Sequence, residues 1–154
     1  MTANVRFTLD TNILFYAVDT DAGAKHEIAR SIFGRAAHAN CVLTVQSLAE
    51  FYHSVTRKRA AESAKAVRLV LRWRQLFATT AADTETVENA VQLEQDHGVS
   101  FWDAMLLATA RQAACAIVLS EDMQDRHRLT GLEIINPFTD HAPAALDDLM
   151  PRLF

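Results

Sequence analysis

The chain lacks a long uninterrupted hydrophobic run. Its most apolar stretch, residues 104–119, is interrupted by Arg111 and Gln112, whereas a membrane-spanning helix needs roughly 18 apolar residues in succession. Residues 1–10 also lack the basic start and the apolar segment of a signal peptide. We therefore expect a cytoplasmic protein without a membrane segment.

Cysteine is scarce as well. The two cysteines, Cys41 and Cys115, stand alone beside apolar segments, and no CxxC pair of the kind used by zinc sites is present. Isolated cysteines in such surroundings behave as small buried apolar residues. The sequence therefore predicts neither a disulfide nor a zinc site.

Acidic residues outnumber basic ones, and the net charge of −4 at first argues against a polyanionic partner. The basic residues are nevertheless concentrated in residues 57–74, where Glu62 is the only acid. The concentrated cations are Arg57, Lys58, Arg59, Lys65, Arg68, Arg72 and Arg74. The first six are candidate phosphate contacts, and a solvated basic face without a ligand is the alternative.

Hydrophobic periodicity predicts helices and strands in alternation. Strands are expected at residues 5–9, 41–45, 116–119 and 132–135. Helices are expected from residue 13 to 16, at 25–37, at 47–58, from there to about 77, at 83–97 and at 100–114. This order predicts an α/β fold with three layers, in which helices flank a mainly parallel central sheet. The domain is expected over residues 1–139, and residues 140–154 form a C-terminal tail that either packs on it or does not.

Four acids stand at the predicted carboxyl ends of strands, where α/β folds collect their ligands. Asp10 follows the first strand, and Asp122 comes just after the third. Glu50 and Asp103 are expected in the first turns of the helices that begin near residues 47 and 100. We expect the four carboxylates to converge.

Each acid also has a purely structural interpretation. Ser47-x-x-Glu50 and Ser100-x-x-Asp103 both fit a capping box, and Asp10 could cap the helix that follows it. Asp122 could belong to an ordinary acidic turn. These interpretations do not explain why four acids should occupy equivalent ends of separate elements.

Clustered carboxylates need a counter-ion. Two like charges about 4 Å apart repel by roughly 4 kcal/mol at an effective dielectric constant near 20. A site made only of oxygen ligands selects hard cations such as Mg²⁺ or Mn²⁺. Such ions activate water and neutralise phosphate charge, so the pattern predicts hydrolysis of phosphodiester bonds.

Five segments, in this order, resemble the PIN domain, and in particular VapC-like toxins of type II toxin–antitoxin modules. They are residues 10–14 (DTNIL), 47–51 (SLAEF), 102–110 (WDAMLLATA), 120–122 (SED) and 134–138 (IINPF). The resemblance covers nearly the whole chain and implies a metal-dependent endoribonuclease. It also implies an RNA substrate, a cognate antitoxin and a homodimer.

The resemblance further implies roles for individual residues. Asp10, Glu50, Asp103 and Asp122 would be catalytic and would hold Mg²⁺ or Mn²⁺, with Asn12 and Ser120 as supporting polar residues. The sequence departs from the family after the fourth acid, where an aromatic residue often follows and Met123 stands instead. It is therefore open whether Glu121 or Asp125 shares the role of Asp122.

Two other enzyme classes are possible. Glu50-x-x-His53 and Glu94-x-x-His97 have the spacing used by di-iron helical bundles, although the predicted strands have no place in a bundle. A phosphatase with Asp10 as nucleophile is the second class, although its usual DxD pattern is broken.

A third alternative is not an enzyme. An RNA-binding module of PIN type, without catalysis, could use the basic surface of residues 57–74 alone. Its binding would depend strongly on salt, because phosphate neutralisation releases counter-ions.

Overall fold

The central sheet has four strands in the order β1-β4-β6-β5. The computed structural model describes residues 4–153, so residues 1–3 and 154, at the ends of the predicted domain and tail, lie outside the described part. The sheet strands are β1 (Phe7–Leu9), β4 (Ile117–Leu119), β5 (Arg128–Leu129) and β6 (Leu132–Ile135). β4 pairs in parallel with β1 and β6, and only β5 is antiparallel.

A second pair of strands, β2 (Val42–Thr44) and β3 (Ala78–Thr80), is also parallel. A single bridge from Phe7 to Cys41 connects this pair to the free edge of β1. The predicted strand at 41–45 is thus shorter than expected. β3 and β5 were not predicted.

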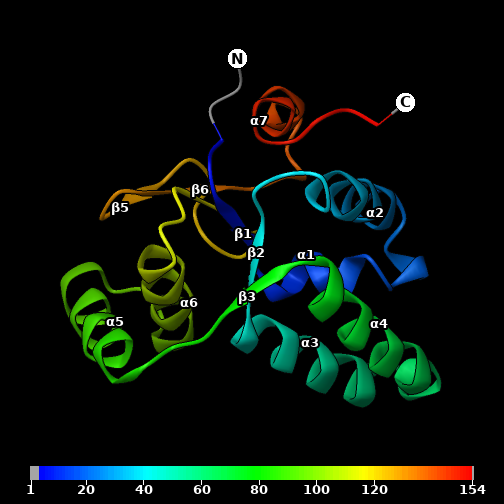
Figure 1. Ribbon diagram of the computed structural model, residues 1–154, viewed down its shortest axis with the longest axis horizontal. Coiled ribbons are helices and arrows are strands. Elements are labelled where there is room, and N and C mark those ends of the chain that lie inside the picture. Colours follow the sequence, from blue (N-terminus) through cyan, green and yellow to red (C-terminus); the bar gives the residue numbers. More distant parts are fainter. Residues whose placement is uncertain (1–3, 154) are drawn as a thin grey trace.

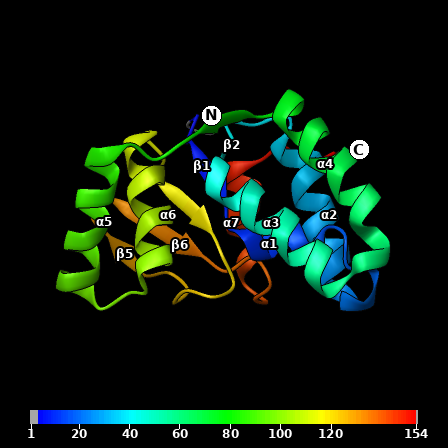
Figure 2. The same ribbon diagram turned by 90° about the horizontal axis from the view of Figure 1, so that it is seen from below.

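Helices lie on both sides of the strands (Figures 1 and 2). On one side are α5 (Thr84–His97) and α6 (Phe101–Gln112). On the other are α1 (Thr11–Tyr16), α2 (Ala24–Ala36), α3 (Val45–Lys58) and α4 (Ser63–Leu76). Short 3-10 turns at Thr20–Ala22 and Ala60–Glu62 connect these helices, and α7 (Ala142–Leu149) follows the last strand. The predicted α/β fold with a mainly parallel, helix-flanked sheet is confirmed.

The buried side chains form two clusters. The first joins β1 and β2 with α1 to α4 and α7, and its largest fully buried side chains include Phe7 and Phe51. The second joins α5 and α6 with β4 and β6, and includes Leu107 and Ile134. The sheet passes between the two clusters, so its carboxyl edge lies where they meet.

Gly98 ends α5 in the left-handed conformation with φ of 66°, which glycine adopts without strain. Cys41 and Cys115 are both buried, as predicted. Among residues 4–153, no helix combines the length and the apolar character that a membrane span requires.

Candidate active site

Asp10 lies between the end of β1 and the start of α1, and its two carboxylate oxygens have different hydrogen-bond partners. Its Oδ1 accepts a hydrogen bond of 2.7 Å from the backbone N–H of Thr11, which caps α1. Its Oδ2 accepts from the Ser120 hydroxyl at 2.7 Å and from the Asn12 amide at 3.3 Å. The capping interpretation of Asp10 is therefore correct, but it uses only one of the two carboxylate oxygens.

Burial raises the pKa of Asp10 from its ordinary 3.8 to about 6. Hydrogen bonds from Ser120 and Thr11 oppose the rise, whereas the negative charges of Asp103 and Asp122 add to it. Only 8% of Asp10 is exposed to solvent. An ionised carboxylate in such a place is stabilised when a cation binds beside it.

Asp122 is connected to Asp10 through Asn12 and Ser120. The Asn12 amide donates to Asp122 Oδ2 at 3.1 Å, and the backbone N–H of Asp122 donates to the Ser120 hydroxyl at 3.2 Å. The Asn12 carbonyl oxygen accepts from the backbone N–H of Glu121 at 3.3 Å. Because β1 and β4 are neighbouring parallel strands, these short polar side chains can connect the two strand ends.

Glu50 is placed one turn later in its helix than expected. Thr44, the last residue of β2, caps α3 by accepting the backbone N–H of Ser47 at 3.0 Å. Glu50 therefore belongs to the second turn, and the predicted capping box of Ser47 with Glu50 is wrong. Its two oxygens accept instead from the Thr11 hydroxyl at 2.8 Å and from the Gln46 amide at 2.9 Å.

Asp103 lies in the first turn of α6, as predicted. The Ser100 hydroxyl caps this helix by accepting the backbone N–H of Asp103 at 3.2 Å. The Asp103 side chain is half-buried and contributes to the raised pKa of Asp10.

All four predicted acids line one cleft between α1, α3 and α6. The other residues that line it are Thr11, Asn12, Phe15, Tyr16, Ser54 and Lys58. Within the described residues 4–153, no three His, Cys, Asp or Glu side chains form a ready-made metal cage. Magnesium usually retains several waters and takes only one or two protein carboxylates, so this all-oxygen donor set fits a hydrated Mg²⁺ or Mn²⁺ ion.

Glu121 and Asp125 are engaged outside the cleft. Glu121 forms an ion pair with Lys25. Asp125 accepts the backbone N–H of Asn136 at 2.7 Å and contacts the His141 ring at 3.0 Å. Neither acid lines the cleft, so their side chains serve local structure at the ends of β4 and β6.

The two Glu-x-x-His pairs do not come together. Glu50 lines the cleft, but His53 is exposed and does not line it. Glu94 and the exposed His97 lie near the end of α5, a helix whose buried face belongs to the second core cluster. The mixed α/β fold also excludes a helical bundle.

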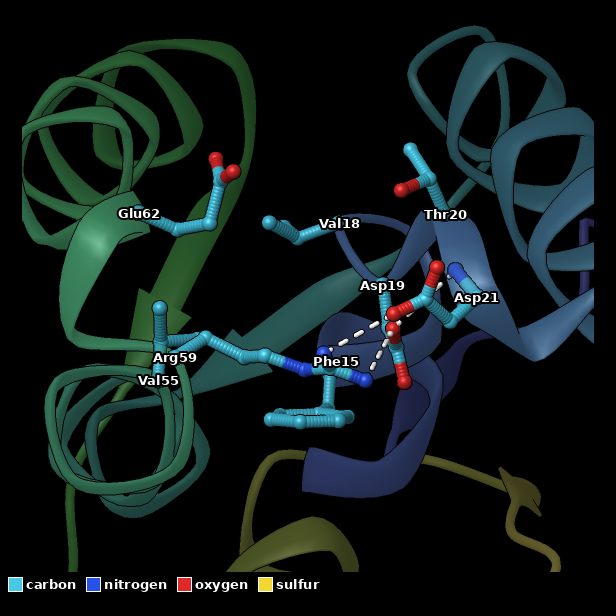
Figure 3. Close-up of a pocket in the computed structure, with 8 residues that line it drawn as sticks. All are labelled: Phe15, Val18, Asp19, Thr20, Asp21, Val55, Arg59 and Glu62. Atoms are coloured by element: carbon cyan, nitrogen blue, oxygen red, sulfur yellow. Dashed lines mark hydrogen bonds and ion pairs between the residues drawn. The ribbon is translucent and has the colours of Figure 1, made fainter.

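The basic segment is divided between several places. Lys58 lines the acidic cleft, and its ammonium lies 5.5 Å from the centre of the Phe15 ring. Arg59, the next residue, reaches across a small pocket and pairs with Asp19 at 3.0 Å and Asp21 at 2.9 Å (Figure 3). Neighbouring cations thus have different electrostatic surroundings.

Two further members of the basic segment face a separate groove between α2 and α4. Lys65 and Arg72 line it together with Arg30 of α2. Arg57 and Arg68 are exposed. The break between α3 and α4 near residue 58 was predicted, but the sequence did not indicate that it turns the cations of one segment toward different surfaces.

A family model for the PIN domain matches residues 7–146. The chain belongs to the PIN domain family. The resemblance inferred from the five sequence segments is thereby confirmed. The match runs from β1 into α7, so it includes all four acids of the cleft.

Solved structures share the fold of this PIN domain at low sequence identity. VapC20 from Mycobacterium tuberculosis, a sarcin-ricin loop cleaving toxin, is 16% identical, with a TM-score of 0.59 and coverage of 75% of this chain and 89% of its own. A toxin-antitoxin complex from Klebsiella pneumoniae is 19% identical, with a TM-score of 0.61 and coverage of 85% and 97%. DNA-bound VapBC from Salmonella typhimurium is 16% identical, with a TM-score of 0.61 and coverage of 84% and 96%. No curated protein matches the chain.

Proposed function

We propose that this PIN-domain protein is a metal-dependent endoribonuclease and the toxin of a toxin–antitoxin pair. The observation that carries the proposal is the cleft in which Asp10, Glu50, Asp103 and Asp122 meet, although they come from four separate segments of the chain. The raised pKa of Asp10, about 6, adds support because a bound cation would favour the ionised form. VapC20, which shares the fold, is a toxin that cleaves the sarcin-ricin loop.

In this proposal Asp10, Asp103, Asp122 and Glu50 surround a hydrated Mg²⁺ or Mn²⁺ ion, which one or two of these carboxylates bind directly and the others bind through its waters. A divalent ion supplies charge neutralisation at a phosphodiester and activates water for hydrolysis. Asn12 fixes Asp10 and Asp122 relative to one another through its amide.

Substrate binding needs positive charge, because a cleft lined by four acids repels RNA. Lys58 is the cation that lines this cleft, so we assign it to a phosphate oxygen close to the scissile bond. Lys65, Arg68 and Arg72 stay predicted contacts to more distant phosphates. Such contacts position the RNA backbone without reading its sequence.

The phosphatase alternative receives little support from the geometry. Phosphatases with a nucleophilic aspartate usually carry a second acid two residues later, and Asn12 stands at that position. Its amide donates to Asp10 Oδ2 at 3.3 Å and to Asp122 Oδ2 at 3.1 Å, so it orients two acids of the cleft instead of supplying another.

The test compares cleavage of a cellular RNA pool by the wild type, Asp10→Asn and Asp103→Asn, each with Mg²⁺, Mn²⁺ or EDTA. Asp96→Asn, at an exposed position of α5 outside the cleft, is the matched control. We expect cutting by the wild type and Asp96→Asn with metal, and a loss of about 100-fold or more in the two cleft variants. Cutting that survives both cleft substitutions would overturn the proposal, and RNA binding without cutting would support the non-catalytic module.

The toxin role has its own test. Two of the structural relatives are complexes of toxin with antitoxin, which supports an antitoxin partner for this chain. We expect that expression of the wild type arrests growth of a bacterial host and that Asp10→Asn does not. Equal growth with both chains would contradict the toxin role, and the predicted homodimer is tested by the mass of the purified protein in solution.

A further inference from the structure

The side-chain amide of Gln46 connects two walls of the acidic cleft. Its Nε2 donates one hydrogen bond of 2.9 Å to Glu50 Oε1, one turn further along α3. It donates another of 3.1 Å to the backbone carbonyl of Trp102, in the first turn of α6. A carboxylate and a carbonyl only accept hydrogen bonds, so the NH₂ group of the amide must face them.

The two walls belong to different parts of the core. α3, which carries Glu50, packs into the first hydrophobic cluster, and α6, which carries Asp103, packs into the second. Within residues 4–153, the bond from Gln46 to Trp102 is the hydrogen bond that joins α3 to α6. The spacing of Glu50 and Asp103 thus depends on how the two clusters meet, and Gln46 crosses that boundary.

We infer that Gln46 is a positioning residue that orients Glu50 and sets its distance from Asp103, and thereby strengthens divalent-ion binding in the cleft. This inference rests on the proposed function. Gln46 does not line the cleft, so it acts through Glu50 and through the residue before Asp103. Polar groups that orient ligands in this way typically change metal affinity by 10- to 100-fold.

The chemistry of the amide suits this task. Two oxygen acceptors that approach the same point repel one another unless a donor lies between them. A lysine or arginine could also donate, but its positive charge would pair with Glu50 and compete with the cation. Glutamine supplies two N–H donors without charge, so it holds the walls together and leaves the negative charge of the cleft available.

Glu50 is held from a second side as well. The Thr11 hydroxyl donates to Glu50 Oε2 at 2.8 Å, so each carboxylate oxygen accepts one protein hydrogen bond. Removing Gln46 would leave Glu50 tied to α1 alone and free to rotate away from α6. The expected defect is therefore in metal binding and not in folding.

The experiment measures Mn²⁺ affinity by calorimetry, and Tm in EDTA, for the wild type, Gln46→Met and Gln92→Met. Methionine keeps the length of the side chain and forms helices well. Gln92 is the matched control, because it donates to Asp96, also four residues ahead, at 2.8 Å on the exposed face of α5. We expect about 10-fold weaker Mn²⁺ binding in Gln46→Met only, with all Tm values within a few degrees.

A double-substitution cycle separates positioning from a general structural effect. If Gln46 acts through Glu50, Gln46→Met costs less Mn²⁺ affinity in a Glu50→Gln background than in the wild type. An equal loss in both backgrounds, or no loss in either, overturns the inference.

Asp10→Asn in the same titration distinguishes failure of this inference from failure of the proposed function. If Mn²⁺ binding is lost in Asp10→Asn but unchanged in Gln46→Met, only the positioning role of Gln46 is overturned. A wild type that binds no Mn²⁺ overturns both.

Discussion

The Ser120 hydroxyl donates a hydrogen bond of 2.7 Å to Asp10 Oδ2 and so joins the carboxyl ends of β4 and β1. Ser120 is fully buried, and its backbone N–H donates to the carbonyl of Ile135 in β6. The ends of β1, β4 and β6 thus together fix Oδ2 of Asp10, the most buried acid of the cleft. Because the hydrogen bond stabilises the ionised carboxylate, it lowers the pKa of Asp10 against the effect of burial.

Ser120→Ala should therefore raise the pKa of Asp10 above the value of about 6 in the wild type. Mn²⁺ binding should weaken, by about 10-fold, because the unoriented carboxyl holds its proton more tightly. The pKa is measured by NMR titration of the Asp10 carboxyl carbon in metal-free protein. Ser63→Ala is the control, since that hydroxyl donates only to the Ala60 carbonyl at 2.8 Å; an unchanged Asp10 pKa in Ser120→Ala would refute the role.

Asp10 should also make the stability of the metal-free protein depend on pH. Its pKa is about 6 in the folded protein, against 3.8 for the ordinary carboxyl, so the folded state binds this proton more tightly than the unfolded state. The stabilising contribution is fully present below pH 3.8 and is lost as the pH rises through about 6. An asparagine at this position would not titrate and would still cap α1.

The free energy of unfolding of Asp10→Asn, relative to the wild type, should thus increase between pH 4 and pH 7.5. The upper limit is about 3 kcal/mol, from 1.36 kcal/mol per pH unit over the shift of Asp10. Urea unfolding in EDTA at both pH values measures the difference. Saturating Mn²⁺ is the control, because it should stabilise the wild type and not the variant; a difference that is independent of pH would count against a perturbed Asp10.

Lys58 and Arg59 should contribute differently to RNA binding, although they are adjacent in the sequence. Lys58 lines the acidic cleft, whereas Arg59 is paired with Asp19 and Asp21. Lys58→Gln should weaken RNA binding several-fold and reduce the salt slope by about 0.7, the value for one phosphate contact on a single strand. Arg59→Gln should leave affinity within about two-fold.

Fluorescence anisotropy with labelled RNA over a range of salt concentrations measures both effects. An Asp10→Asn background prevents cleavage during the titration. If Arg59→Gln weakens binding as much as Lys58→Gln, the prediction is wrong. The RNA would then cross the pocket of Figure 3 and break the ion pairs of Arg59 with Asp19 and Asp21.

The sequence was sufficient to predict elements with strong periodicity and the acids at their ends. Asp10 could be placed because a strand, an acid and a helix follow one another directly. Glu50 was predicted in the wrong turn of its helix. Thr44 both ends β2 and caps α3, whereas by sequence alone Ser47 is an equally good capping residue. β3 was missed because its three residues are partly or fully exposed and show no alternation.

The polar contacts of the cleft join residues that are far apart in the sequence. A local sequence pattern does not show which distant residues will meet. Gln46 and Trp102 lie 56 residues apart in the sequence, and nothing in either segment indicates that they meet. The same holds for Thr11 and Glu50, which are 39 residues apart. Sequence motifs identify which acids are candidates, whereas the packing of α3 against α1 and the contact of Gln46 with α6 decide which neutral side chains orient them.

The sequence predicts a tail over residues 140–154 and no helix α7, because Pro143 lies in the first turn of this short segment. Proline is well tolerated in the first turn of a helix. Leu146 and Met150 belong to the first core cluster. The Arg35 guanidinium of α2 donates to the carbonyls of both residues, at 3.2 and 2.9 Å, and to Asp147 at 2.8 Å.

Leu146→Ala should therefore destabilise the whole domain and not only the C-terminal end of the chain. Leu146 is 5% exposed, and removing a buried leucine side chain usually lowers the free energy of unfolding by about 2–5 kcal/mol. Urea unfolding followed by circular dichroism measures the change, and Leu153→Ala, at a residue that is 53% exposed, is the matched control. If Leu146→Ala unfolds at the same urea concentration as the wild type, α7 is only loosely attached, and the first core cluster is stable without it.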